Sequence, residues 1–172
     1  MTGTLRGLRS VHEFRQAPPE AEKLRYSIGL PGGAYCAGSA RSAVRALLTR
    51  HGLRDLLDTA ALAASELVAC AHRFTPDKEM VLKIRWQFDA LRIVVYDQHP
   101  AHSSPDASEE CRRRRSREMW LLAAVVEACG GDWGLTPVLT PAGGTKSWAL
   151  LPLPLPLPLP LPLPLPLPLP LS

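Results

Sequence analysis

The stretch AALAASELVACAHR, from Ala60 to Arg73, decides the fold, because a single carboxylate, Glu66, lies inside an otherwise apolar helical run. Apolar residues recur here at helical spacing and predict a helix face that is turned toward a core. These residues are Leu57, Ala60, Ala64, Leu67, Val68 and Ala71. Glu66 lies on an adjoining stripe with Cys70 and Arg73, because residues about one turn apart stack on one side of a helix. From this helix alone, we expect Glu66 to reach water or to pair with Arg73.

The composition is that of one folded domain whose positive charge is local. Of the 172 residues 46% are hydrophobic, enough for a core, and the formal net charge is +4. Arginines at positions 112–115 and 117 supply more than this excess. Such a run indicates a basic loop or a helix start, and neither a helix-turn-helix signature nor an aromatic platform accompanies it. We therefore expect no direct nucleic-acid partner.

The cysteines and the apolar runs indicate a cytoplasmic protein. The four cysteines are scattered without a C-x-x-C pair, and no apolar signal segment follows Met1. The longest apolar run before the C-terminal repeat, Met119 to Val126, is far shorter than the roughly 20 residues that a transmembrane helix needs. Reduced thiols, a cytoplasmic location and no membrane contact are the expectations.

The chain divides into three segments. Residues 1–22 lack periodicity and predict a flexible N-terminal arm, whereas residues 23–151 contain the periodic elements of a domain. Residues 152–172 form a Leu-Pro repeat in which ten prolines lack backbone donors, so polyproline II is the expected geometry. We interpret the repeat as a tolerated expansion of a Leu-Pro ending, without a dedicated role.

The first half of the domain predicts a strand and two helices. Apolar and polar residues alternate from Lys23 to Leu30, as in a half-buried strand. The helix that follows ends near Gly52, and Asp55 or Asp58 is expected to cap the helix that carries Glu66.

The second half predicts a hairpin that ends in a buried carboxylate. Residues 81–88 and 91–96 predict two strands joined by a turn at Asp89-Ala90. Asp97 has the same parity as the apolar Leu91, Ile93 and Val95, so its side chain should lie on the buried side of the sheet. A long loop over residues 98–110, a third helix near 118–129 and a closing hairpin of residues 133–139 and 145–151 complete the domain.

These elements together predict an α+β fold. We expect a two-layer α/β sandwich with a mixed, mainly antiparallel sheet and three helices on one face.

The order and spacing of three motifs add a family resemblance. SELVACAHR, from Ser65 to Arg73, is similar to the N-box of short actinobacterial regulators related to anti-sigma-factor serine kinases, commonly SELVTNAVRH. Asp97, which follows IVVY, matches the G1 aspartate of that group, and GGTKSWALLPLP at residues 143–154 is similar to its last strand. The chain thus resembles the histidine-kinase-like ATPases, which share the Bergerat-type ATP-binding fold with gyrase and sensor kinases.

The resemblance implies a nucleotide site with assigned roles. Glu66 would polarise the attacking water or hydroxyl, and Asp97 would accept a hydrogen bond from the adenine amino group. Cys70 stands at the position of the asparagine that ligates Mg²⁺ between the phosphates. Arg73 and Arg117 are the expected basic contacts to bound ATP.

Two departures weaken this site. A neutral thiol at Cys70 is a poor ligand for Mg²⁺, which prefers oxygen. The family's lid uses glycines to bring backbone amides to the phosphates, whereas residues 115–120 of this chain, RSREMW, contain none.

His99, His102 and Cys111, together with Asp97, form a candidate zinc site in the sequence. We disfavour this site at this level, because His-x-x-His in a proline-containing loop lacks the helix or knuckle that fixes ligands. Neither a P-loop nor a G-x-S-x-G motif occurs in the sequence.

The sequence therefore predicts an ATP-binding regulator that resembles anti-sigma-factor serine/threonine kinases and uses ATP and Mg²⁺. Its expected partner is a regulatory protein such as a sigma factor or an anti-sigma-factor antagonist, and homodimers are common in the resembling family. The alternative is a catalytically dead pseudo-ATPase that serves as a protein-interaction module.

Overall fold

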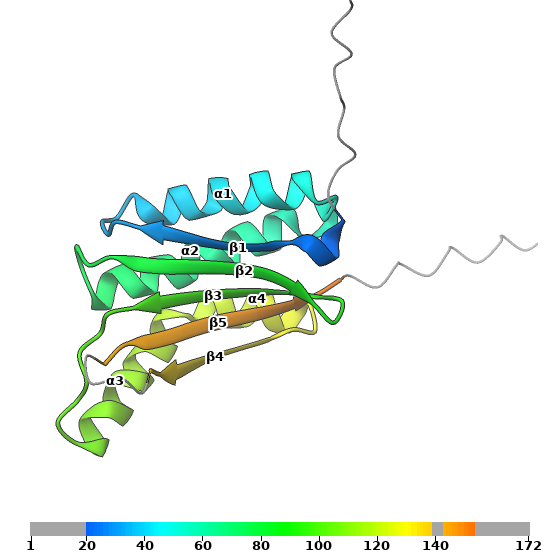
Figure 1. Ribbon diagram of the computed structural model, residues 1–172. Helices are drawn as coiled ribbons and strands as arrows, with labels where there is room; N and C mark the ends of the chain where they lie inside the picture. Colours follow the sequence, from blue (N-terminus) through cyan, green and yellow to red (C-terminus); the bar gives the residue numbers. More distant parts are fainter. Residues whose placement is uncertain (1–19, 139–142, 154–172) are drawn as a thin grey trace, which may run out of the picture.

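An antiparallel sheet covered on one face by helices makes up the described part of the protein. The computed structural model describes residues 20–138 and 143–153. Within these ranges the elements are η1 (Ala21–Lys23), β1 (Arg25–Leu30), α1 (Cys36–Arg50), η2 (Arg54–Leu56), α2 (Leu57–Phe74), β2 (Met80–Gln87), β3 (Ala90–Asp97), α3 (Pro105–Glu118), α4 (Trp120–Ala128), β4 (Asp132–Pro137) and β5 (Thr145–Pro152). Figure 1 shows the helices on one side of the sheet, with α3 at the end where β3 finishes. The described chain is thus an α+β two-layer sandwich.

The sheet is antiparallel throughout the described residues. Its five strands lie in the order β1-β2-β3-β5-β4, and each neighbouring pair is antiparallel. The expectation of a mixed sheet is therefore wrong. The two-residue connection between β2 and β3 requires antiparallel pairing of these strands, because a parallel pair needs a longer crossover.

Helix α2 lies at the centre of the core. Its predicted apolar face is confirmed, because five of its members are fully buried: Ala60, Ala64, Leu67, Val68 and Ala71. Ala63 and Cys70, on the stripe beside that face, are buried as well. Neighbouring helices explain this, since α2 contacts both α1 and α4 in addition to the sheet.

The helix count differs from the expectation, because residues 105–118 form a helix where the sequence suggested mostly loop. The side chain of Ser104 accepts a hydrogen bond from the backbone N–H of Ala107 at 3.2 Å, and Pro105 occupies the first turn. A Ser cap followed by Pro is a strong helix start. The described residues therefore contain four α-helices, with α3 and α4 separated only at the buried Met119.

Two local predictions are also wrong. Leu56 is the N-cap residue of α2 and no side chain caps it; Asp58 instead pairs with Arg45, with 2.7 Å between the charged atoms. The turn between β2 and β3 lies at Phe88 and Asp89, which have φ of 53° and 54°. Positive φ at both central residues matches the twist of a two-residue hairpin.

Several expectations fall on residues that the structure does not describe. They are the arm over residues 1–19, the turn at residues 139–142 and the Leu-Pro repeat beyond Leu153. Across residues 20–138 and 143–153, no helix has the length and apolar character to cross a bilayer.

Candidate functional site at the end of strand β3

The candidate site centres on a buried ion pair between Asp97 and Arg115. Asp97 ends β3 on the helix-covered face, which confirms the predicted parity, and its side chain has no exposed surface. Arg115, on α3, has 2% of its side chain exposed. Its Nη1 donates to Asp97 Oδ2 at 2.6 Å, and its Nη2 donates to Oδ1 at 3.3 Å. The pair is therefore a two-pronged contact that joins α3 to the end of the sheet.

The surroundings of this pair hold both side chains in place. The backbone N–H of His99 donates to Asp97 Oδ1 at 3.0 Å, so both carboxylate oxygens accept hydrogen bonds. The guanidinium carbon of Arg115 lies 4.5 Å from the centre of the Phe74 ring, at the end of α2. Arg115 Nε is buried without a hydrogen-bond partner among the described residues. The aromatic ring and the carboxylate together stabilise a charge that water does not reach.

Cys70 is a neutral thiol next to this pair. Burial raises its pKa to about 11, and the positive charge of Arg115 opposes that rise. A protonated sulfur is a weak ligand for a hard cation. A site built on this sulfur does not suit Mg²⁺, because Mg²⁺ prefers oxygen ligands.

The other predicted site residues lie apart from the ion pair. Glu66 is partly exposed, and its side chain forms no ion pair or hydrogen bond with any residue in the described ranges. Arg73 is exposed and pairs with Glu118, so the expected pair between Glu66 and Arg73 is not formed. Arg117 is also exposed and directly precedes Glu118 in α3.

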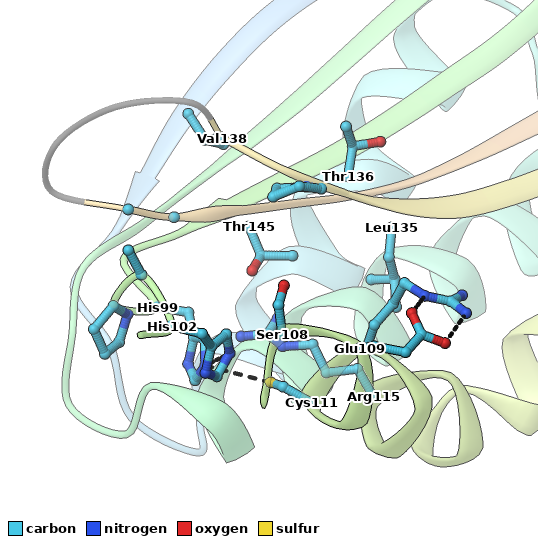
Figure 2. Close-up of a pocket in the computed structure, with 16 residues that line it drawn as sticks. His99, His102, Ser108, Glu109, Cys111, Arg115, Leu135, Thr136, Val138 and Thr145 are labelled. Atoms are coloured by element: carbon cyan, nitrogen blue, oxygen red, sulfur yellow. Dashed lines mark hydrogen bonds and ion pairs between the residues drawn. The ribbon is translucent and has the colours of Figure 1, made fainter. Parts of the chain in front are cut away.

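A cavity of about 410 Å³ lies between α3 and the β4–β5 hairpin, as Figure 2 shows. Its walls include His99 and His102 from the loop after β3, Cys111 and Arg115 from α3, and Thr145 from β5. Glu66, Cys70 and Arg73 do not line it. The cavity is therefore separate from Glu66, Cys70 and Arg73 of α2.

No protein-family model matches this sequence, and no curated protein matches it.

Sequence reasoning missed Arg115 as the partner of Asp97. The helix start at Ser104 and Pro105 was a signal that the arginine run is helical, but it does not tell which arginine of the run is buried. In α3 and its C-cap, Cys111, Arg115 and Met119 follow one another at intervals of one turn on one side of the helix, and Arg115 and Met119 are buried. The neighbouring arginines at positions 112–114 then face water.

Proposed function

We propose that this protein is a regulatory protein-interaction module that resembles anti-sigma-factor serine kinases and has a degenerate nucleotide site. The observation that carries this proposal is the buried pair of Asp97 and Arg115. Asp97 is the residue that would accept from adenine, and its oxygens already accept three hydrogen bonds. An adenine amino group would have to displace a charged donor from a buried carboxylate, which is unfavourable.

Cys70 supports the same proposal from the phosphate side of the site. Its pKa of about 11 keeps the thiol protonated at neutral pH, and the residue that should orient Mg²⁺ is therefore not an oxygen donor. Glu66 would then be a general base without an oriented phosphate to act on.

The open face of the sheet is the surface that we assign to partner binding. We define it by the cations and aromatic residues that face away from the helices: Arg25, Lys83, Arg85, Arg92, Lys146, Tyr96 and Trp148. Arg25 lies opposite Arg85, and Arg85 lies opposite Arg92, so three arginines form a row across three strands. None of the five cations forms an ion pair with a described residue. Like charges opposite one another are destabilising, and an acidic surface would relieve that cost.

The aromatic residues on the open face favour an acidic protein over a nucleic acid. Lys83 lies over the Tyr96 ring at 4.9 Å from its centre, and Arg92 lies over the Trp148 ring at 5.4 Å. Proteins that bind single strands use free ring faces to stack bases. Here the protein's own cations occupy these rings.

Calorimetric titration of the full chain with ATP, with and without Mg²⁺, tests the proposed site. We expect at most weak binding that Mg²⁺ does not strengthen, and no phosphate release or phosphotransfer. Robust Mg²⁺-dependent turnover would overturn the proposal. Cys70→Asn supplies the missing oxygen, so it should increase the Mg²⁺ dependence of binding without restoring turnover, because the lid glycines remain absent.

Poly-glutamate and a single-stranded RNA homopolymer are matched probes of the open face. We expect Arg85→Glu to weaken poly-glutamate binding several-fold at low salt. Arg41→Glu is the control, because Arg41 is exposed on α1 in the other layer and the substitution changes the net charge equally. Equal losses of poly-glutamate affinity in the two variants would refute the assignment of the open face. If RNA binds more tightly than poly-glutamate and this binding depends on Arg85, the partner is a nucleic acid and not an acidic protein.

The second candidate is an ATP-binding regulator of the anti-sigma-factor kinase type. The cavity of about 410 Å³ favours it, because Arg112 and Arg115 line that space and can neutralise phosphate. For this candidate, Arg115 must leave Asp97 when nucleotide enters. Tight ATP binding by the wild type, together with its loss in Asp97→Asn, would favour this second candidate over the degenerate site.

A further inference from the structure

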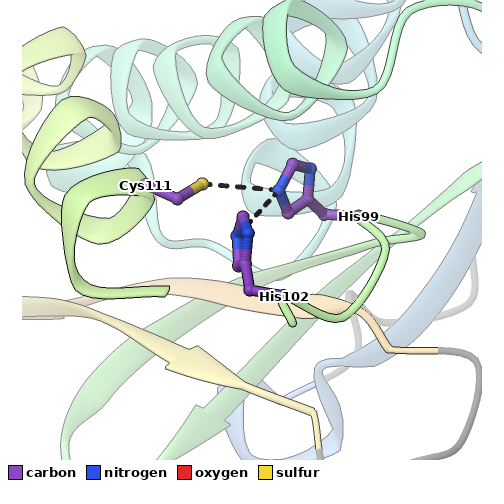
Figure 3. A group of neighbouring side chains, drawn as sticks. All are labelled: His99, His102 and Cys111. Atoms are coloured by element: carbon purple, nitrogen blue, oxygen red, sulfur yellow. Dashed lines mark hydrogen bonds between the residues drawn. The ribbon is translucent and has the colours of Figure 1, made fainter. Parts of the chain in front are cut away.

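Three metal-ligating side chains converge beside the cavity. His99 and His102 come from the loop after β3, and Cys111 comes from the second turn of α3; Figure 3 shows the three side chains pointing toward one another. The Nε2 atoms of the two histidines are 3.2 Å apart, and Cys111 Sγ is 3.3 Å from His99 Nε2. All three candidate ligand atoms lie within 4.8 Å of one another.

These distances are close to those between ligands of a tetrahedral zinc ion. Zinc lies about 2.0–2.1 Å from histidine nitrogen and about 2.3 Å from cysteine sulfur. For tetrahedral angles, two nitrogens are then about 3.3 Å apart, and a nitrogen and a sulfur about 3.6 Å. The two pairs that include His99 are within a few tenths of an ångström of these values. His102 Nε2 and Cys111 Sγ are bounded only by the 4.8 Å limit, so the exposed His102 ring would have to move by up to about 1 Å to complete the geometry.

The fold fixes these residues more firmly than the sequence suggested. Cys111 lies in a capped helix, and the backbone of His99 is bound to the buried Asp97. The His99 ring also packs edge-on against Phe74, with 6.2 Å between the ring centres. A Cβ atom on Gly143 would lie 2.5 Å from the backbone nitrogen of Ala101, so the β4–β5 hairpin presses directly on this loop. The sequence disfavoured a zinc site because the loop alone lacks a helix that fixes ligands; α3 provides that helix by holding Cys111.

We propose that His99, His102 and Cys111 bind a zinc ion, with a fourth coordination position directed to the cavity that the same residues line. This donor set suits zinc, because imidazole and thiolate are its preferred ligands, whereas Mg²⁺ and Ca²⁺ prefer oxygen. Three protein ligands with an open position are typical of sites that bind water or an exchangeable ligand. The site is independent of the nucleotide residues Glu66 and Cys70.

The protonation of His99 is compatible with this role. Burial lowers its pKa from the ordinary value, and the positive charge of Arg115 lowers it further, while the Phe74 carbonyl and Asp97 oppose the shift. The neutral ring offers the lone pair that a metal requires. His102 and Cys111 face His99, and Arg112, which lines the neighbouring cavity, is paired with Glu109.

Zinc and cobalt titrations of untagged, chelator-treated full chain under a non-thiol reductant test the proposal. We expect one Zn²⁺ per chain, measured against a chromophoric chelator, and Mg²⁺ should not compete. Co²⁺ should give tetrahedral d–d bands and a thiolate charge-transfer band. Cys111→Ser should abolish the charge-transfer band and weaken Zn²⁺ binding by about 100-fold, and His102→Ala should weaken Zn²⁺ binding by at least about tenfold.

The exposed thiol of Cys129 provides the matched control. Cys129→Ser should leave stoichiometry, affinity and the cobalt spectrum unchanged, since Cys129 lies at the end of α4 outside the cluster. His102 is exposed, so its substitution should leave the circular dichroism spectrum unaltered. Unchanged zinc affinity in folded Cys111→Ser and His102→Ala proteins would overturn the proposal, as would the absence of one-to-one binding by the wild type.

Discussion

The two sides of helix α3 carry ion pairs of the same chemistry in opposite surroundings. On the buried side, Arg115 joins Asp97, with side-chain exposures of 2% and 0%. On the exposed side, Glu109 accepts from Arg112 and Arg113 at distances between 2.7 and 3.0 Å. The distances are comparable, but the access of water differs.

This difference shows why the distance between two charges does not measure how much their contact contributes to the stability of the fold. Breaking a buried pair leaves one charge without water or a partner, whereas water replaces either partner of an exposed pair. The buried pair also joins residues 18 positions apart, while the exposed pairs join residues within one helical turn. Only the former positions α3 against the sheet.

The largest expected effect comes from breaking the buried pair. Arg115→Met keeps much of the side-chain volume and leaves Asp97 buried without its counter-charge, so unfolding free energy should fall by about 3–5 kcal/mol. Urea unfolding followed by circular dichroism measures this loss. The matched double variant Arg115→Met with Asp97→Asn removes the stranded charge and should regain a large part of it. A loss below about 1 kcal/mol in the single variant would show that water reaches the pair.

The next largest effect should come from Cys70 at alkaline pH. The pKa of the folded Cys70 thiol is about 11, above the ordinary value of 9.0, so the folded state holds the proton more tightly than the unfolded state. The contribution of the protonated Cys70 thiol to the unfolding free energy is fully present below about pH 9 and is lost as the pH rises toward 11. The loss should reach roughly 2 kcal/mol, and Cys70→Ala should remove it. The pH dependence of urea unfolding in the two proteins is the measurement; identical alkaline slopes would contradict the assignment.

The smallest effect is expected from the exposed pairs. Hydrogen bonds from Arg112 lower the pKa of Glu109 to about 2, and Arg113 adds to this shift. Any contribution to stability is present above the ordinary carboxyl pKa and is lost as the pH falls toward 2. Since water screens these charges, the midpoint of thermal unfolding of Glu109→Gln should equal that of the wild type within experimental error at pH 7. A clear decrease in the midpoint would show that α3 depends on this network.

The sequence predicts regular elements well where the apolar pattern is local. The α2 face and the inward parity of Asp97 follow from side-chain period alone, and both are confirmed. The start of α3 was missed because residues 98–110 have a loop-like composition, although Ser104 and Pro105 carry a local start signal.

The burial of Arg115 could not be read from composition, because neighbouring arginines are locally equivalent. Its partner lies at the end of β3, and only the three-dimensional fold brings the two together. For the same reason, the sequence disfavoured the convergence of His99, His102 and Cys111: the distance between loop and helix is set by the Asp97 contact. Site geometry here depends on tertiary structure more than the fold class does.

The pairing of β5 has a consequence for the length of the Leu-Pro repeat. Ser147, Ala149 and Leu151 are buried at alternate positions of β5, and the Leu-Pro repeat follows directly after Leu151. The pairing of β5 with β3 ends at Pro152, so units gained or lost beyond that residue follow the last paired position and cannot shift the register of the strand before it. Pro152 lies opposite Ala90, whereas Thr145 lies opposite Asp97, so such changes begin about seven strand residues, or roughly 24 Å, from the ion pair. Changes in the number of Leu-Pro units therefore leave the register of β5 against β3, and the ion pair of Asp97 with Arg115, unaltered.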